Sequence, residues 1–152
     1  MLCFPGVPCT CLHLLVYDAA RPLSVQQHMW NALDSIPVKE RVKFVSSPRG
    51  KSLHNLGCAV DLTICDAKGI PLDMGAGFDD IRLIAYPMHE AKFLADGSLT
   101  MQHVENRKLL RRVMRYAGFT GIPTEWWHFN AYSKKEALER FQVIETEESI
   151  DQ

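Results

Sequence analysis

One segment of the sequence joins a histidine to a carboxylate across a tight turn. His54 lies in a polar stretch, Gly57 permits the turn, and Asp61 follows within the apolar run that begins at Cys58. Side chains alternate along a strand, so Asp61 belongs to the face opposite the apolar positions. A strand of this length brings Asp61 back towards His54. We therefore expect both side chains to reach one cation.

A second segment places a glutamate three residues before a histidine. On a regular strand Glu125 and His128 would project to opposite faces, because side chains alternate. For both to serve one site, the chain must turn or bulge around Trp126. Pro123 and Thr124, just before this segment, are compatible with an irregular start of the strand. The alternative is a surface ion pair flanked by core tryptophans.

Together these residues have the composition of a catalytic zinc site. Three protein ligands with one open position distinguish a catalytic zinc from a structural one. His54, Asp61 and His128 would hold one Zn²⁺ per chain, and the ion would lower the pKa of a bound water. Glu125 would take the proton of that water and pass it to the leaving amine. A loop histidine by itself, such as His54, is more often a surface residue.

Arg21 is the candidate cation for the negative charge that develops on the substrate. It ends a predicted buried strand and is followed by Pro22, which restricts the backbone there. The alternative role is an ion pair with a neighbouring carboxylate such as Asp18.

A separate metal site made of Cys9, Cys11 and His13 is a weaker candidate, since no further ligand pair follows at a suitable spacing.

The elements that must position these residues indicate an α+β fold with a mainly antiparallel central sheet flanked by helices. Strands and helices follow one another in an irregular order, without the alternation of a parallel sheet. We expect one domain over residues 1–152, with an acidic tail at 145–152. The expected strands are 12–19, 42–45, 58–64 and 126–132, and the expected helices are 25–36 (capped by Ser24), 102–116 (capped by Thr100) and 134–143.

Composition excludes several classes of function. Lys and Arg (17) nearly balance Asp and Glu (18), which gives a net charge of -1, so nucleic acid is not an expected partner. No segment approaches the length of a membrane span, and no signal peptide is recognisable. The sequence as written predicts a cytoplasmic protein, or a periplasmic one if an export signal lies upstream. It does not predict the oligomeric state.

The two motifs resemble those of the D-alanyl-D-alanine dipeptidases, zinc peptidases of the vancomycin-resistance type. That family has S-x-H-x-x-G-x-x-x-D followed later by E-W-W-H. The matching residues are Ser52, His54, Gly57 and Asp61, then Glu125, Trp126, Trp127 and His128. The resemblance runs from about Leu15 to Val143. It implies a D,D-peptidase/Hedgehog-like fold, zinc on the two histidines and Asp61, and Glu125 as general base.

The resemblance also implies roles for three further residues. Residues 18–22 resemble a family segment whose arginine, here Arg21, stabilises the transition state. Residues 74–79 resemble Met-Gly-x-x-Phe-Asp, whose aspartate, here Asp79, receives the free ammonium of the substrate, while Ser52 helps to hold the substrate. An ammonium-binding carboxylate would select dipeptides over longer chains. Ala20 departs from the aromatic residue of many members, and members usually carry further residues before residue 12.

The expected function is therefore hydrolysis of D-Ala-D-Ala in cell-wall peptide metabolism, with a small dipeptide as substrate. Two alternatives remain. The first is a zinc D,D-carboxypeptidase acting on peptidoglycan stem peptides, whose members typically have proline where this chain has Trp126. The second is a non-catalytic metal-binding module of the same fold, although such a module would not need Glu125 or Arg21.

Overall fold

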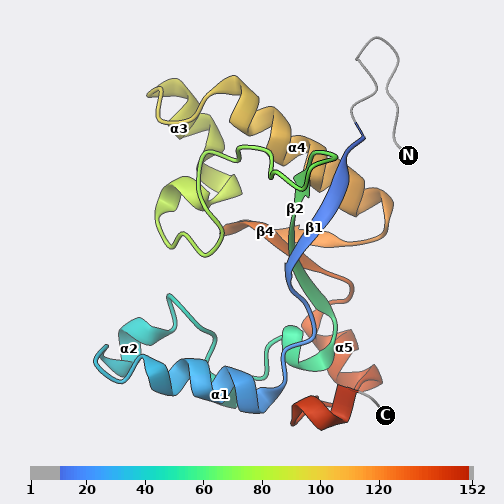
Figure 1. The fold of residues 1–152 in the computed structure, drawn as a ribbon. Coiled ribbons are helices and arrows are strands. Elements are labelled where there is room, and N and C mark those ends of the chain that lie inside the picture. The colour runs from blue at the N-terminus through green and yellow to red at the C-terminus, as the bar shows by residue number, and fades with distance from the viewer. Residues whose placement is uncertain (1–10, 151–152) are drawn as a thin grey trace. The chain divides into compact units, whose positions relative to one another are not determined.

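The computed structural model describes residues 11–150, which form a four-stranded antiparallel sheet and five α-helices (Figure 1). The strands are β1 (His13–Asp18), β2 (Ala59–Cys65), β3 (Thr120–Ile122) and β4 (Glu125–Asn130), in the spatial order β1-β2-β4-β3. The helices are α1 (Leu23–Ala32), α2 (Val38–Arg41), α3 (Glu90–Ala95), α4 (Met101–Tyr116) and α5 (Lys134–Arg140). The predicted α+β class is confirmed.

The chain divides into two compact units, which are described separately. The first contains the chain up to Tyr17 together with Asp61–Phe129, and the second contains Asp18–Val60 together with the chain from Asn130 onward. Most of the sheet belongs to the first unit. Strands β2 and β4 continue along the chain from one unit into the other.

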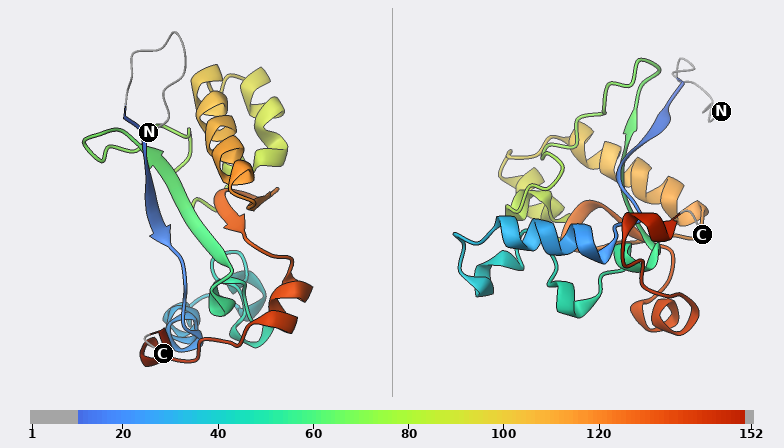
Figure 2. Two further views of the ribbon diagram at one scale, coloured as in Figure 1. Left: turned by 90° about the vertical axis from the view of Figure 1, so that its right-hand side faces the viewer. Right: turned by 60° about the horizontal axis from the view of Figure 1, so that its bottom comes forward.

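In the first unit, α3 and α4 lie side by side on one side of the sheet (Figure 2). Both sets of alternating positions on β2 are buried: Leu62 and Ile64 are apolar, and Asp61 and Thr63 belong to the opposite set. The predicted division of this strand into an apolar and a polar face is therefore present. The polar positions are as deeply buried as the apolar ones.

Helix α4 follows its sequence signals closely. Thr100 caps it, since the Thr100 side chain accepts a hydrogen bond from the backbone N–H of His103 and the His103 ring accepts one from the backbone N–H of Thr100. Val104 and Leu110 are buried on its apolar side. Gly118 follows the helix with φ of 87°, the left-handed conformation that glycine adopts most readily.

In the second unit, a small apolar cluster forms between α5 and the segment that contains Leu56 and Cys58. Leu56, Cys58 and Ala137 form its centre, and burial raises the pKa of the Cys58 thiol, which therefore stays neutral. The segment after α5 pairs with the start of α1, because the Leu23 N–H donates to the carbonyl of Ile144 at 2.8 Å. The expected acidic tail contains a short helical turn, Glu147–Ile150, and residues 151–152 lie outside the described residues.

Several local predictions were wrong or incomplete. The expected strand at 42–45 is a turn that follows α2, because so short an apolar run does not distinguish a strand from the end of a helix. Helix α1 begins one residue before Ser24, is preceded by Pro22 without a side-chain cap, and ends at Ala32 instead of residue 36. The three-residue strand β3 was not predicted, since its sequence, Thr-Gly-Ile, is too short to show a period.

Strand β1 lies at the edge of the sheet in the described part of the chain. Leu14 and Val16, two positions apart on one of its faces, are 51% and 55% exposed.

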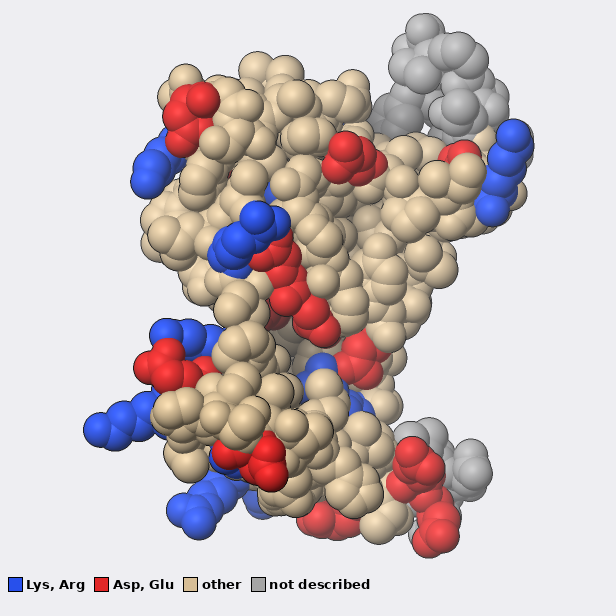
Figure 3. Space-filling model, turned by 60° about the vertical axis from the view of Figure 1, so that its left-hand side comes forward, with Lys and Arg blue, Asp and Glu red and all other residues tan. Residues whose placement is uncertain are grey.

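Acidic and basic side chains are interspersed over the face drawn in Figure 3, in keeping with the nearly balanced composition. None of the described helices has both the length and the apolar character that a membrane span requires.

Candidate metal centre

Asp61 and His128 meet on neighbouring strands of the first unit. Asp61 lies on β2 and His128 on β4, and the Oδ1 atom of Asp61 is 2.9 Å from Nδ1 of His128. Their side chains are 5% and 13% exposed. A carboxylate oxygen and an imidazole nitrogen are both common zinc ligands. Two of the three predicted ligands are therefore in direct contact.

Glu125 is the first residue of β4 and lies beside this pair. Its Oε2 atom is 3.8 Å from Nδ1 of His128. Only residues 123–124 separate β3 from β4, so a tight hairpin turn directly precedes Glu125. The chain was expected to turn or bulge around Trp126; it turns at residues 123–124 instead, and β4 runs continuously from Glu125 through Trp126. The carboxylate of Glu125 is 40% exposed, in contrast to the nearly buried Asp61.

His54 belongs to the second unit, in a short helical turn that ends at Gly57 with φ of 63°. The His54 ring is buried, and its Nδ1 atom lies 2.7 Å from the carbonyl oxygen of Ala19. A carbonyl oxygen only accepts, so Nδ1 carries the proton and Nε2 presents a lone pair. Metal-binding histidines commonly have this arrangement, in which a backbone acceptor fixes the tautomer.

Arg21 is tied both to this histidine and to a carboxylate. The backbone N–H of Arg21 donates to the carbonyl of His54 at 3.0 Å. Its guanidinium donates from Nε to Oδ2 of Asp18 at 2.8 Å, and Nη2 contacts the same oxygen. The ion pair considered from sequence is therefore present. It also holds the Arg21 side chain, 15% exposed, in a fixed orientation.

A buried amide network that the sequence did not predict supports this part of the second unit. Asn55 and Gln26 are fully buried, and Asn55 Nδ2 donates to the carbonyl of Arg21 at 2.8 Å and to Oε1 of Gln26 at 3.0 Å. The hydroxyl of Ser52 donates to the same Gln26 oxygen at 3.0 Å. Ser52 thus takes part in positioning Arg21 and His54. No local pattern marks Gln26, which lies 29 residues from Asn55 along the chain.

Among the described residues, His54, Asp61 and His128 each offer a ligand atom to a metal ion, two of them from the first unit and His54 from the second. Two imidazole nitrogens and one carboxylate fit zinc, and the Nδ1 hydrogen bond of His54 leaves its other nitrogen available to an ion. Of the alternative cluster, Cys9 lies outside the described residues and Cys11 is exposed.

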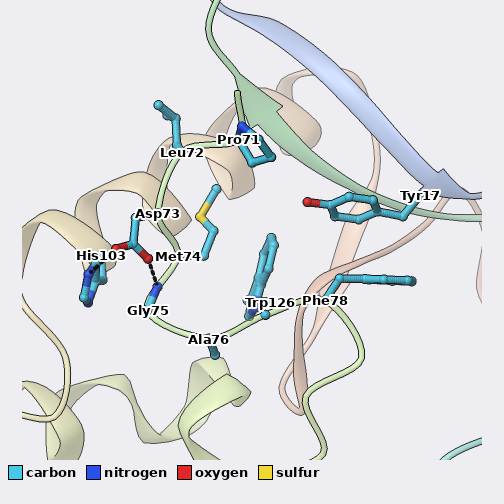
Figure 4. Close-up of a pocket in the computed structure, with 11 residues that line it drawn as sticks. Tyr17, Pro71, Leu72, Asp73, Met74, Gly75, Ala76, Phe78, His103 and Trp126 are labelled. Carbon is cyan, nitrogen blue, oxygen red and sulfur yellow. Dashed lines mark hydrogen bonds and ion pairs between the residues drawn. The ribbon is translucent and has the colours of Figure 1, made fainter. Parts of the chain in front are cut away.

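A loop between β2 and α3 forms one wall of a cavity of about 610 Å³ in the first unit (Figure 4). Residues 73–78 of this loop line the cavity opposite aromatic side chains, among them Tyr17 and Trp126. The backbone N–H of Gly75 donates to Asp73 and holds the pKa of that carboxyl below its ordinary value. Asp79 follows directly, is exposed, and has a φ of 58°.

Comparison with known proteins gives a consistent picture. Residues 7–145 match the model of the M15 peptidase family described as D-ala-D-ala dipeptidase. The chain is 39% identical to a D-alanyl-D-alanine dipeptidase of Escherichia coli, over 78% of this chain and 54% of that protein. It is 30% identical to one of Synechocystis, over 77% of this chain and 58% of that protein. The chain thus spans little more than half the length of these relatives.

Proposed function

We propose that this chain, which belongs to the D-ala-D-ala dipeptidase family of M15 peptidases, hydrolyses D-alanyl-D-alanine to two D-alanines with the help of one zinc ion. The observation that carries the proposal is the contact of Asp61 with His128 beside Glu125. An imidazole and a carboxylate meet there, and a second, more exposed carboxylate, that of Glu125, lies alongside. A site that only stored a metal would not need Glu125.

In this proposal His54, Asp61 and His128 bind the zinc. The hydrogen bond from His54 Nδ1 to the Ala19 carbonyl fixes the ring and would leave Nε2 available to the ion. A zinc bound there would polarise the scissile carbonyl and lower the pKa of a water towards neutrality. The burial of Asp61 and His128 strengthens their interaction with a cation, because little water screens it.

Glu125 and Arg21 carry the proton and charge chemistry. Glu125 accepts the proton of the attacking water and delivers it to the leaving amine, which its partly exposed position allows. Arg21 donates to the oxygen on which negative charge develops. Asp18 orients Arg21, and Asn55 fixes the backbone carbonyl of the same residue, so the guanidinium needs little rearrangement during the reaction.

Asp79 and Ser52 complete the proposed site on the substrate side. Asp79 would receive the free ammonium of the dipeptide, so a longer peptide would lose this ion pair. Ser52 would help to hold the substrate from its place in the amide network. The substrate is thus a small peptide with a free amino terminus.

The direct test is to incubate the chain, loaded with zinc, with D-Ala-D-Ala and with a peptidoglycan stem pentapeptide. We expect D-alanine release from the dipeptide. Release from the pentapeptide alone would show a D,D-carboxypeptidase instead, and hydrolysis of neither would contradict the proposal.

Zinc binding is tested separately from activity. We expect His54→Ala to abolish stoichiometric zinc, measured by plasma mass spectrometry. His28→Ala is the matched control, since His28 is an exposed histidine on α1 of the same unit, and it should retain zinc. Unchanged zinc in His54→Ala would remove His54 from the ligand set.

A further inference from the structure

One fully buried guanidinium on α4 binds both ends of the loop that carries Asp79. Nε of Arg107 donates to the carbonyl of Met74 at 2.7 Å, and Nη2 donates to the carbonyl of Ile84 at 3.1 Å. Arg107 has no exposed surface. Asp79 lies midway between the two carbonyls along the chain. A single side chain therefore constrains the separation of the two ends of this segment.

A carboxylate balances the buried charge of Arg107. Nη1 of Arg107 lies 3.6 Å from Oε1 of Glu90, and the same Glu90 receives two hydrogen bonds from Arg111, at 2.7 and 2.8 Å. Burial lowers the pKa of Arg107, since it disfavours the charged form. Burying an arginine in this way is costly for stability. A role in holding the loop accounts for its presence better than stability does.

Other α4 residues fix the first end of the loop against the helix. Asn106 Nδ2 donates to the carbonyl of Asp73 at 2.7 Å, and the Asp73 carboxylate lies 3.1 Å from Nε2 of His103 (Figure 4). The backbone at Gly75 approaches so closely that a Cβ there would lie 2.4 Å from a Leu99 methyl carbon. The loop is thus held against α4 by both hydrogen bonds and packing.

We propose that Arg107, assisted by Asn106, is a positioning residue for substrate binding, which sets the place of Asp79 by holding the segment from Met74 to Ile84. The inference rests on the proposed role of Asp79 as the ammonium-binding carboxylate. It adds Asn106 and Arg107, two residues outside the motifs that lie 23 or more positions along the chain from the loop carbonyls they bind. The same loop is the wall of the cavity in Figure 4, so its position also shapes that space.

The test combines Arg107→Lys with Asp79→Asn. Lysine keeps the charge but cannot donate to two separated carbonyls as the planar guanidinium does. We expect Arg107→Lys to raise KM for D-Ala-D-Ala about tenfold while kcat stays within about twofold. In the Asp79→Asn background the same change should leave KM nearly unaltered, because Arg107 acts through Asp79. Arg111→Lys, which touches Glu90 but no loop carbonyl, is the matched control and should keep the KM of the unmodified chain.

Amide hydrogen exchange of residues 75–84 provides a readout that does not depend on activity. Exchange there should accelerate in Arg107→Lys and in the milder Asn106→Asp, but not in Arg111→Lys. Unchanged exchange in both loop variants would overturn the inference, as would an equal rise in KM with and without Asp79. Failure of the unmodified chain to hydrolyse D-Ala-D-Ala would instead contradict the proposed function, while the exchange result would still decide whether Arg107 holds the loop.

Discussion

Replacing Asn55 with alanine tests the amide network that supports Arg21 and His54. The side chain of Asn55 donates to the Arg21 carbonyl and to Gln26, and it accepts from the backbone N–H of Ser52 at 2.7 Å. All three bonds disappear in Asn55→Ala, and the partner groups cannot regain water easily because Asn55 is fully buried. At about 1 kcal/mol for each bond, the loss is about 3 kcal/mol.

This loss is large relative to the stability of a domain, which is roughly 5–15 kcal/mol. For a chain of this length it corresponds to a fall in Tm of roughly 10 °C. Urea unfolding and calorimetry would measure both quantities. Asn31→Ala is the control, because the Asn31 side chain accepts a hydrogen bond from Gln27 on the exposed side of α1, and its loss should change stability by less than about 0.5 kcal/mol.

A loss of stability in Asn55→Ala no greater than that of the control would contradict this expectation. The assigned hydrogen bonds would then contribute nothing net to folding. We also expect weaker zinc binding, because the Arg21 backbone N–H bonds to His54. Zinc titration of the still-folded variant would measure this effect separately.

Three further predictions concern single residues. Glu125→Gln should lower kcat by about a thousandfold while zinc content stays stoichiometric, and comparable activity would remove Glu125 as the base. Gly75→Ala should lower the free energy of unfolding, measured with urea, several times more than Gly97→Ala does. Both glycines have a positive φ, but of the two only Gly75 has other atoms within contact distance of an added Cβ. The pKa of Asp73 is lower in the folded chain than the ordinary aspartate pKa. Its carboxylate therefore stabilises the fold at pH values above the ordinary pKa, and this stabilisation is lost as the pH falls through the pKa of the folded chain. Thermal melts of Asp73→Asn should therefore show a deficit at about pH 6 that shrinks as the pH falls below the ordinary aspartate pKa, and a constant deficit would argue against the titration.

Local patterns were sufficient to predict the elements whose signals lie within a few residues. Thr100 and Gly118 bound α4 as expected, and the alternation of β2 separated Asp61 from the apolar positions. The short segments failed, since the run at 42–45 has too few residues to reveal a period. The contact of Asp61 with His128 agrees with the predicted grouping of these two residues.

The supporting side chains could not be predicted in the same way. Gln26 and Arg107 look like ordinary polar positions of amphipathic helices, and only the folded chain reveals that both are fully buried. Their partners lie 20 or more residues away in sequence. Hydrogen bonding at such separations depends on how helices and loops pack, which residue type and spacing do not encode.

The exposed edge strand has a practical consequence for handling the protein. Backbone groups on the outer side of β1 can pair with a strand of another molecule, and the exposed Leu14 and Val16 would favour such association through their apolar surface. At high concentration this edge offers a site for intermolecular sheet formation. A lysine in place of Val16 would introduce the kind of charge with which natural sheets discourage growth at their edges.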